Sequence, residues 1–206
     1  MMVKDKLSSH ALLARAEAQF SESVALKQRF LSPANLETLV LMAERIAASI
    51  AQGGKLMLCG NGGSACDAQH LAGELLVRLR PQVNRQPIAA LALATDACSI
   101  TACANDYGFE QIYARMVQAL GKPGDVLLGL STSGRSQNVI KALECAKTQG
   151  IQAFGFLGSD GGAMLGACEL SLLVPSFDPN RVQEVHITMG HILMDLIESL
   201  VMTGNE

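Results

Sequence analysis

The sequence is poor in aromatic and charged residues. It has no tryptophan, 6 Phe and 2 Tyr in 206 residues, and Asp, Glu, Lys and Arg make up 17% of it, below the usual share of about a quarter. Hydrophobic residues make up 49%. A chain of this length buries roughly 70% of the surface of its unfolded form, which excludes a disordered protein. So few charges also predict that other protein chains cover part of the folded surface.

The charged residues show no excess of positive charge. There are 16 Lys and Arg against 19 Asp and Glu, for a formal net charge of −3. Proteins that bind the phosphate backbone of DNA or RNA neutralise it with clustered basic side chains. The composition therefore argues against nucleic acid as the primary partner.

Long hydrophobic runs are also missing. No stretch of 18 uninterrupted apolar residues occurs, so no segment reads as a membrane span. The first 30 residues contain no apolar signal core, because they are interrupted by Lys4, Asp5, Lys6, Arg15, Glu17 and Glu22. We therefore expect a soluble, cytoplasmic protein that does not insert into a membrane.

The 6 cysteines never form a C-x-x-C pair, which argues against a zinc ribbon and against a thioredoxin-type redox motif. They lie mostly in apolar or alanine-rich segments, at positions 59, 66, 98, 103, 145 and 168. Free cysteine packs as a small hydrophobic residue in a reducing compartment. We therefore expect buried, reduced thiols.

The chain shows no internal repeat, low-complexity tract or linker, so we expect one domain over residues 1–206. The one irregular stretch, residues 80–87, is predicted to be a loop. Apolar residues recur with helical spacing over residues 36–50, and residues 11–30 are amphipathic. Residues 1–53 are therefore predicted to form N-terminal helices.

The rest of the chain, residues 54–206, contains short apolar runs of strand length, separated mostly by stretches that can form helices. The runs cover residues 55–59, 88–93, 126–130, 153–157 and 170–174. This alternation predicts a doubly wound α/β fold, in which helices cover both faces of a five-stranded parallel sheet. The last element, over residues 182–202, is apolar on nearly every side, so we expect a long C-terminal helix shared between subunits.

Two loops that follow predicted strands are rich in small residues. The first, from Gly60 to Ala65, reads Gly-Asn-Gly-Gly-Ser-Ala, and the second, from Ser131 to Ser136, reads Ser-Thr-Ser-Gly-Arg-Ser. Doubly wound sheets bind ligands beyond the carboxyl ends of their strands. Each loop also precedes a predicted helix, where backbone N–H groups and hydroxyls can converge on an anion. The alternative to anion binding is that both loops are only tight turns with ordinary helix caps. Residues 131–136, however, carry more hydroxyls than one cap needs.

The first loop also fits the G-x-G-x-x-A pattern of dinucleotide-binding proteins, through Gly60, Gly62 and Ala65. A dinucleotide site would want an acidic residue at the end of the second strand, and the run over residues 88–93 has none before Asp96. The chain also lacks the G-x-x-x-x-G-K-[ST] pattern of nucleoside triphosphate sites. Hydroxyl groups without a lysine favour a phosphorylated metabolite, and a sugar phosphate is the natural candidate.

Polar residues on two predicted helices form a candidate metal site. His70 and Glu74 share one helix face, and Gln183 and His191 lie about 80° apart around the last helix. Together they would make a nitrogen and oxygen site for zinc or another borderline divalent metal. Spacing alone leaves open the alternative that each histidine is a hydrogen-bonded polar group, and His186 and His10 are assigned to that class.

A carboxylate and an imidazole beside a phosphate-binding loop suit proton transfer next to a carbonyl group. A base removes a carbon-bound proton and an acid protonates the oxygen, which gives an enediol. This chemistry is aldose–ketose isomerisation, which requires no organic cofactor.

Several separated motifs, in order through nearly the whole chain, resemble the sedoheptulose 7-phosphate isomerase (phosphoheptose isomerase) family of the sugar-isomerase (SIS) domain superfamily. They are Cys59-Gly60-Asn61-Gly62-Gly63-Ser64, Asp67-Ala68-Gln69-His70 with Glu74, Asn105-Asp106, residues 131–136, and Arg181-Val182-Gln183-Glu184-Val185-His186 with His191. The resemblance implies a flavodoxin-like three-layer α/β/α sandwich with extra N-terminal helices, and a homotetramer with active sites at subunit interfaces. It also implies conversion of sedoheptulose 7-phosphate to D-glycero-D-manno-heptose 7-phosphate, the first step of ADP-heptose synthesis for the lipopolysaccharide inner core.

By matching positions, the resemblance implies that Glu74 is the general base and His191 the general acid. It implies one zinc ion per subunit, held by His70, Glu74, Gln183 and His191. The implied substrate contacts are Asn61, Gly62, Gly63, Ser64, Glu74, Asn105, Asp106, Ser131, Thr132, Ser133, Ser136 and Gln183. A carboxylate bound to zinc is a poorer base, so either Glu74 loosens from the metal during turnover or the metal chiefly organises the site.

The chain departs from the family at two positions. Ala65 replaces a residue that is polar in some members, and Arg135 stands where asparagine is frequent, so it either contacts the phosphate or points into solvent.

Two non-enzymatic classes share the superfamily. A tetrameric partner of the bacterial replication initiator lacks the acidic and imidazole pair, which Glu74 and His191 retain here. A sugar-phosphate-sensing regulator would add a DNA-binding segment, for which we expect no room in 206 residues.

Overall fold

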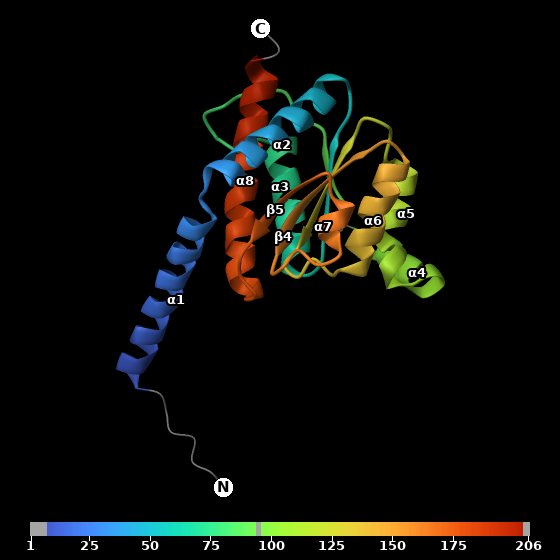
Figure 1. The fold of residues 1–206 in the computed structure, drawn as a ribbon. Helices are drawn as coiled ribbons and strands as arrows, with labels where there is room; N and C mark the ends of the chain where they lie inside the picture. Colours follow the sequence, from blue (N-terminus) through green and yellow to red (C-terminus); the bar gives the residue numbers. More distant parts are fainter. Residues whose placement is uncertain (1–7, 94–95, 204–206) are drawn as a thin grey trace.

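The computed structural model describes residues 8–93 and 96–203 of the chain (Figure 1). Residues 1–7, 94–95 and 204–206, which the predicted single domain includes, lie outside the described residues. In chain order the elements are α1 (Ser9–Phe30), α2 (Pro33–Ala51), β1 (Leu56–Gly60), α3 (Gly63–Leu76), β2 (Ala90–Ala92), α4 (Ala97–Tyr107), the 3₁₀ helix η1 (Phe109–Gln111), α5 (Ile112–Leu120), β3 (Val126–Ser131), α6 (Gln137–Thr148), β4 (Gln152–Gly158), α7 (Met164–Ala167), β5 (Leu170–Val174) and α8 (Pro179–Thr203).

The strands form one parallel sheet in the order β2-β1-β3-β4-β5, which is the flavodoxin-like order. In its register Leu58 pairs with Ala92 on one side and with Leu128 on the other. Strands β1 and β3 are buried along their whole length, which explains why they are unbroken apolar runs in the sequence. The predicted α/β fold with a five-stranded parallel sheet is confirmed.

The boundaries of one strand differ clearly from the prediction. The apolar run over residues 88–93 predicts a longer strand than β2, which covers only Ala90–Ala92. The N–H group of Ile88 instead donates to the carbonyl of Leu75 at the end of α3. Residues 80–87, just before this strand, contain no helix or strand, as predicted.

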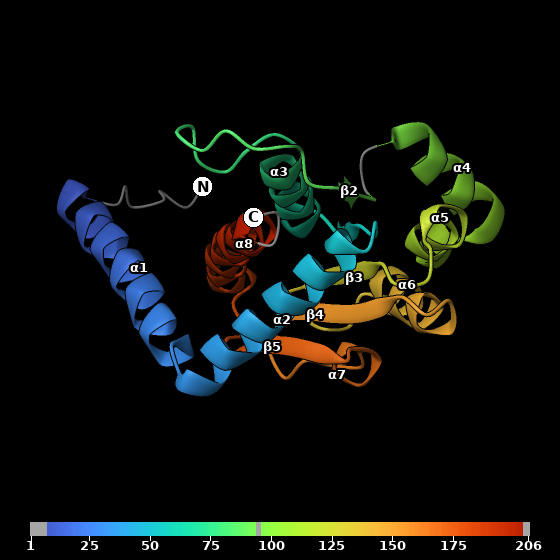
Figure 2. The same cartoon turned by 90° about the horizontal axis from the view of Figure 1, so that it is seen from above.

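Helices cover both faces of the sheet, as Figure 2 shows from above. On one face α2, α3 and α8 enclose a core that includes Ile46, Leu71 and Leu193. On the other face α5, α6 and α7 enclose a second core, which includes Ile112 and Leu143. These are the three layers that the family resemblance implies.

Helix α1 extends away from the sheet layers (Figures 1 and 2). Of its side chains only Leu26 and Phe30 are buried, where α1 meets the rest of the fold. Leu13 and Phe20, farther out, are 71% and 77% exposed. Exposed apolar side chains on a projecting helix are typical of a protein interface.

The other predicted helices also have counterparts in the structure. The segments over residues 11–30 and 36–50 are α1 and α2, and the last segment, over residues 182–202, is α8. By length and composition only, α8 is apolar enough to cross a membrane, and 44% of its most apolar 18-residue window is buried inside the protein. A single helix of this kind is weak evidence for a membrane span. That α8 is shared between subunits stays a prediction.

The prediction of buried cysteines is correct at some positions and wrong at others. All 6 are free, and Cys59 and Cys103 are buried. Cys66 on α3 and Cys98 on α4 are exposed instead. Both helices are rich in alanine and weakly amphipathic, so their composition did not reveal which side faces the core.

Candidate active site

The centre of the candidate site lies between α3 and α8, which pack side by side on one face of the sheet. Gly63 and Leu71 of α3 lie against Gln183 and Gly190 of α8, respectively. Because the contacts follow the same order along both helices, α3 and α8 run in the same direction.

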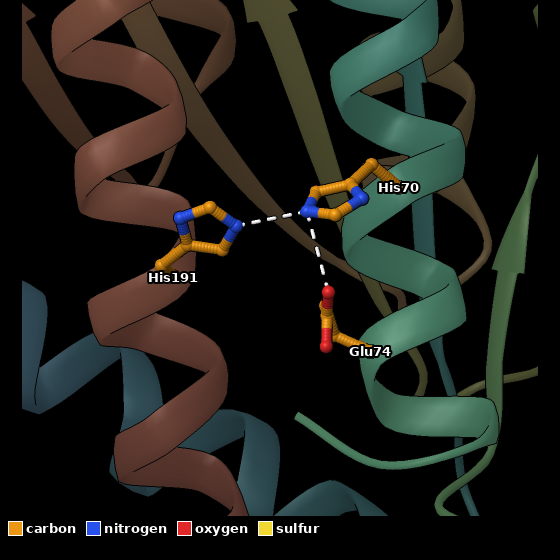
Figure 3. Close-up of side chains that lie close together, drawn as sticks. All are labelled: His70, Glu74 and His191. Carbon is orange, nitrogen blue, oxygen red and sulfur yellow. Dashed lines mark hydrogen bonds and ion pairs between the residues drawn. The ribbon is translucent and has the colours of Figure 1, made fainter. Parts of the chain in front are cut away.

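Three side chains that can carry a proton converge between these helices (Figure 3). The Nε2 atom of His70 lies 2.8 Å from Nε2 of His191 and 3.3 Å from Oε1 of Glu74. The two imidazole rings meet edge to face, with their centroids 5.1 Å apart. The structure thus brings together three of the four residues predicted as metal ligands.

This donor set fits a zinc ion. His70, Glu74 and His191 each offer one donor atom, and these atoms all lie within 4.8 Å of one another. Two imidazole nitrogens and one carboxylate oxygen are donors that zinc and other borderline divalent metals accept. A ligand can reach them, because the side chain of His70 is 50% exposed and that of Glu74 is 18% exposed.

Gln183, the fourth predicted ligand, belongs to α8, and its side chain packs against the first residue of α3. A Cβ atom on Gly63 would come within 2.7 Å of the side-chain oxygen of Gln183, so the amide packs directly over the first residue of the helix. Glycine at position 63 therefore makes room for the amide. The role of Gln183 as a metal ligand stays a prediction.

Asp67 faces the same cluster from α3. Burial raises the pKa of its carboxyl group, against the opposing effect of the nearby imidazoles of His70 and His191. Its Oδ2 atom is buried and has no hydrogen-bond partner among the described residues. The motif that carries the family resemblance contains Asp67, but no role was predicted for it. The spacing of Asp67 from His70 and Glu74 indicates that Asp67 belongs to the site, because residues three and seven positions apart share a helix face.

The first predicted binding loop joins β1 to α3. Gly62, the residue just before α3, has a φ angle of +56°, which glycine adopts without strain. The hydroxyl of Tyr113 donates to the carbonyl of Gly60, which ties the loop to α5. Gly62 and Gly63 are exposed, whereas Ser64 is buried beneath them. Ser64 is therefore the least accessible of the predicted substrate contacts in this loop.

The second loop joins β3 to α6, and its own hydroxyl groups brace it. Ser131 Oγ lies 3.0 Å from Ser136 Oγ and accepts from the N–H of Gly134 at 3.1 Å. Ser133 Oγ accepts from the N–H of Arg135. One hydroxyl of the Ser131–Ser136 pair donates to the other, so the pair keeps one proton for an anion, and Ser133 keeps its own. Thr132, the remaining predicted contact, is half-buried.

Arg135 is paired at the surface with the loop that follows β4. Its Nη2 lies 2.7 Å from Oδ2 of Asp160, and its Nη1 donates to the carbonyl of Ser133 at 3.0 Å. Both members of the pair are more than half exposed. Without substrate, Arg135 is thus exposed and paired with Asp160, and a contact between Arg135 and the substrate phosphate stays a prediction.

A pair of amide side chains connects the two loops. Asn61 Nδ2 donates to Asn138 Oδ1 at 2.8 Å, and Asn138 Nδ2 donates back to Asn61 Oδ1 at 2.7 Å. Because β1 and β3 are neighbouring strands, this pair holds the loops at their ends side by side. No role was predicted for Asn138, since nothing local in the sequence distinguishes it from other asparagines.

Asn105 and Asp106 lie apart from this cluster, in the last turn of α4, where both are exposed. Asn105 Nδ2 donates to Asp106 Oδ1 at 2.8 Å. Within residues 8–93 and 96–203, no side-chain hydrogen bond links the pair to either loop or to the histidines. Their part in substrate binding stays a prediction.

Comparison with known proteins identifies the family. The family model of the SIS domain matches residues 19–158. A curated phosphoheptose isomerase from Pelodictyon phaeoclathratiforme is 51% identical over 180 residues, which cover 87% of this chain and 85% of that protein. The chain belongs to the phosphoheptose isomerase family of SIS-domain proteins.

Solved structures of phosphoheptose isomerases share the fold of this family member. The enzyme from Neisseria gonorrhoeae aligns with a TM-score of 0.84 at 39% identity, over 91% of this chain and 99% of that chain. The enzyme from Francisella tularensis aligns with a TM-score of 0.85 at 33% identity, over 94% and 100%. The predicted family and fold are both confirmed.

Membership of the phosphoheptose isomerase family does not favour the non-catalytic alternative, a partner of the replication initiator. The relatives above are named as isomerases. Glu74 and His191, which the non-catalytic class lacks, are both present here and lie beside the same imidazole.

Proposed function

We propose that the protein is an aldose–ketose isomerase that converts sedoheptulose 7-phosphate to D-glycero-D-manno-heptose 7-phosphate. The observation that carries the proposal is the position of Glu74 and His191, which approach His70 from two different helices. A carboxylate and an imidazole in such an arrangement can move protons at neighbouring carbon and oxygen atoms. The names of the relatives support the substrate.

In the proposed reaction Glu74 is the general base and His191 the general acid. Glu74 removes a proton from the carbon next to the carbonyl group, and His191 protonates the carbonyl oxygen, which gives the enediol. Glu74 then returns its proton to the carbon that carried the carbonyl group, while the hydroxyl on the adjacent carbon gives its proton to His191. The product is the aldose, and both side chains return to their starting forms.

The loops bind the substrate in this proposal. The hydroxyls of the second loop, of which that of Ser131 is buried, and the start of α6 hold the phosphate. Hydroxyl protons and free N–H groups both favour an anion. The residues assigned to the phosphate are Ser131, Thr132, Ser133 and Ser136. The residues assigned to the rest of the sugar phosphate are Asn61, Gly62, Gly63, Ser64, Asn105, Asp106 and Gln183.

We propose one zinc ion per subunit, with His70, Glu74, Gln183 and His191 as its ligands. The clustering of three of these donors supports the assignment. A bound zinc ion supplies positive charge that favours electron density on the reacting oxygen. Glu74 would be both a ligand and the base, so either it loosens from the metal during turnover or the metal chiefly organises the site.

We also propose a homotetramer with active sites at subunit interfaces. The exposed apolar residues of α1 support it, and so does a groove of about 300 Å³ between α1, α2 and α8. Apolar side chains that line this groove include Val24, Phe30, Leu36, Val185, Met189 and Ile192.

The proposed reaction would supply the first step of ADP-heptose synthesis for the lipopolysaccharide inner core. Its place would be the cytoplasm, with a small sugar phosphate as partner and neither nucleic acid nor membrane. Membership of a family of metabolic enzymes supports this placement.

Incubation with sedoheptulose 7-phosphate, followed by NMR of the aldose product, tests the reaction. We expect product from the parent protein and a fall in kcat of about 10²–10⁴-fold in Glu74→Gln, which keeps the side-chain size but removes the base. The matched control is Glu144→Gln, at an exposed position on α6, which should retain full turnover. Chelation should lower turnover, and added zinc should restore it.

Two outcomes would contradict the proposal. A folded Glu74→Gln variant that turns over normally would exclude Glu74 as the base. A folded, zinc-loaded parent protein that forms no product from sedoheptulose 7-phosphate would exclude the reaction.

A further inference from the structure

Arg85 lies in the loop between α3 and β2, and its guanidinium group is almost wholly buried. The side chain is 4% exposed. Its Nη2 donates to the carbonyl of Glu74 at 2.8 Å, and its Nη1 donates to the carbonyls of Leu75 at 2.9 Å and Gln86 at 3.0 Å. The last carbonyls of a helix have no partner within the helix. Arg85 therefore caps α3 at the residue that carries the proposed base.

A further contact of Arg85 reaches across to α8. Its Nε donates to Glu198 Oε2 at 2.6 Å, and the side chain of Glu198 is 0% exposed. Glu198 follows His191 by about two helical turns, so both lie on the same side of α8. Through Arg85, the backbone of Glu74 is therefore connected to the helix that carries His191.

We propose that Arg85 and Glu198 are positioning residues, which hold α3 against α8 and thereby set the separation of Glu74 and His191. Their polar contacts are with backbone carbonyls and with each other, and Glu198 Oε1 also lies 3.6 Å from Nε of Arg80. Neither side chain contacts the clustered imidazoles. These contacts alone support the effect of Arg85 and Glu198 on the separation of Glu74 and His191. The effect of that separation on catalysis rests on the proposed function.

A purely stabilising role does not explain why this position holds a buried ion pair. Well-packed apolar side chains of similar volume stabilise a fold as well as a buried ion pair does, or better. A guanidinium group, however, is planar and donates in fixed directions, so it can bind a carboxylate and helix carbonyls together. Such a contact defines how the two helices are placed along and around each other, and that placement decides whether Glu74 and His191 meet.

The double variant Arg85→Met/Glu198→Leu separates positioning from stability. It leaves neither charge buried without its partner, but the carbonyls of Glu74 and Gln86 lose their donor. We therefore expect a folded protein whose unfolding temperature falls only modestly. It also removes the donor that holds the carbonyl of Glu74. The side-chain ¹⁵N NMR signals of His70 and His191 in the metal-free protein should therefore change. The chain has only 4 histidines, and buried His186 serves as the internal reference that should not change.

Metal binding and turnover give independent readouts. In the double variant, kcat and the affinity for cobalt, followed by its visible absorption, should each fall about tenfold or more, with a smaller change in KM. The matched control is Arg45→Met, which removes a partly exposed ion pair between α2 and Glu169, outside the contacts of Arg85 and Glu198. This control should behave as the parent protein does.

Unchanged imidazole signals in the folded double variant would overturn the proposal, and so would parental kcat and cobalt affinity in that variant. A parent protein without isomerase turnover would contradict the proposed function instead, and the imidazole signals would still decide the roles of Arg85 and Glu198. If the double variant does not fold, Glu198→Gln takes its place. It keeps a hydrogen bond to Arg85 without the charge, and it should move the same two signals by a smaller amount.

Discussion

Asn138 is 2% exposed, and every contact of its amide is made inside the protein. Its Oδ1 accepts from Asn61 and from the N–H of Val139, and its Nδ2 donates to Asn61. Asn138→Asp keeps both acceptor roles of Oδ1, but it replaces the Nδ2 donor by a carboxylate oxygen that faces the side-chain oxygen of Asn61. We expect the free energy of unfolding to fall by about 1–3 kcal/mol and KM for the sugar phosphate to rise more than kcat falls.

Denaturant unfolding and steady-state kinetics on the Asn138→Asp variant measure these two effects. The control is Gln82→Glu, the same amide-to-acid change at an exposed position in a loop. Equal KM values for Asn138→Asp and the parent protein would show that the amide pair does not shape the substrate site.

His186 is a second buried polar residue, and it makes stability depend on pH. Its Nε2 lies 3.1 Å from the carbonyl of Leu157, and its Nδ1 is buried without a hydrogen-bond partner in the described residues. Burial lowers the pKa of His186 from 6.5 to about 4. The unfolded chain therefore binds a proton at a higher pH than the folded chain does. The free energy of unfolding should fall as pH drops from 6.5 toward about 4, by at most about 1.4 kcal/mol per pH unit from this group.

Urea unfolding from about pH 7.5 to about pH 4.5 measures this dependence. His186→Gln should flatten it, because glutamine does not titrate. His10→Gln, at an exposed position of α1, should leave it unchanged. Identical pH profiles for the parent protein and His186→Gln would contradict the prediction.

At the scale of elements, the loop after β3 depends on a close backbone approach to the loop after β4. Gly134 has a φ angle of +64°, and a Cβ atom there would overlap the carbonyl of Gly161. Gly134→Ala must push the two loops apart. We expect the free energy of unfolding to fall by about 1–3 kcal/mol and KM for the sugar phosphate to rise about tenfold or more, because the predicted phosphate hydroxyls shift.

A second glycine supplies the control for this substitution. Gly124 has a φ angle of +90°, but a Cβ atom there would meet nothing within 4 Å. Gly124→Ala therefore tests backbone strain without overlap, and it should lower stability by about 1–2 kcal/mol with no change in KM. If both variants had the same KM, the approach of the two loops would not matter for substrate binding.

At the scale of the whole molecule, α1 carries several large apolar side chains that the rest of the chain leaves exposed. Leu13 and Phe20 are its most exposed large apolar side chains. In the proposed tetramer these positions are buried, and an unpaired charge in an interface costs about 3–5 kcal/mol. We expect Leu13→Glu/Phe20→Glu to dissociate the tetramer and to lower turnover, because the proposed active sites lie at subunit interfaces.

Sedimentation velocity at micromolar concentration measures the assembly. Leu120→Glu, on α5 at the opposite face of the sheet, is the control and should leave the tetramer intact. A tetramer that survives both charges on α1 would place the interface elsewhere, and a monomeric parent protein would contradict the proposed assembly.

The fold could be predicted well because its signals are local. Strands β1 and β3 are buried on both faces, so the sequence shows them as continuous apolar runs. The prediction was less accurate at β2, where Ile88 turns its N–H to α3 instead of the sheet. The two binding loops were also recognisable, because tight turns at helix N-termini require glycine and hydroxyl residues at adjacent positions.

By itself, then, the sequence determined the order of helices and strands, the two loops and the chemical types available to the site. Tertiary structure alone decided which side chains meet, because helical spacing shows which residues share a face but not what that face packs against. The contacts that organise the site join residues far apart in the chain: His70 with His191, Asn61 with Asn138, and Arg85 with Glu198. The first and third contacts depend on how α3 packs against α8, and the second depends on the pairing of β1 with β3. Packing and pairing are properties of the whole core rather than of any local segment.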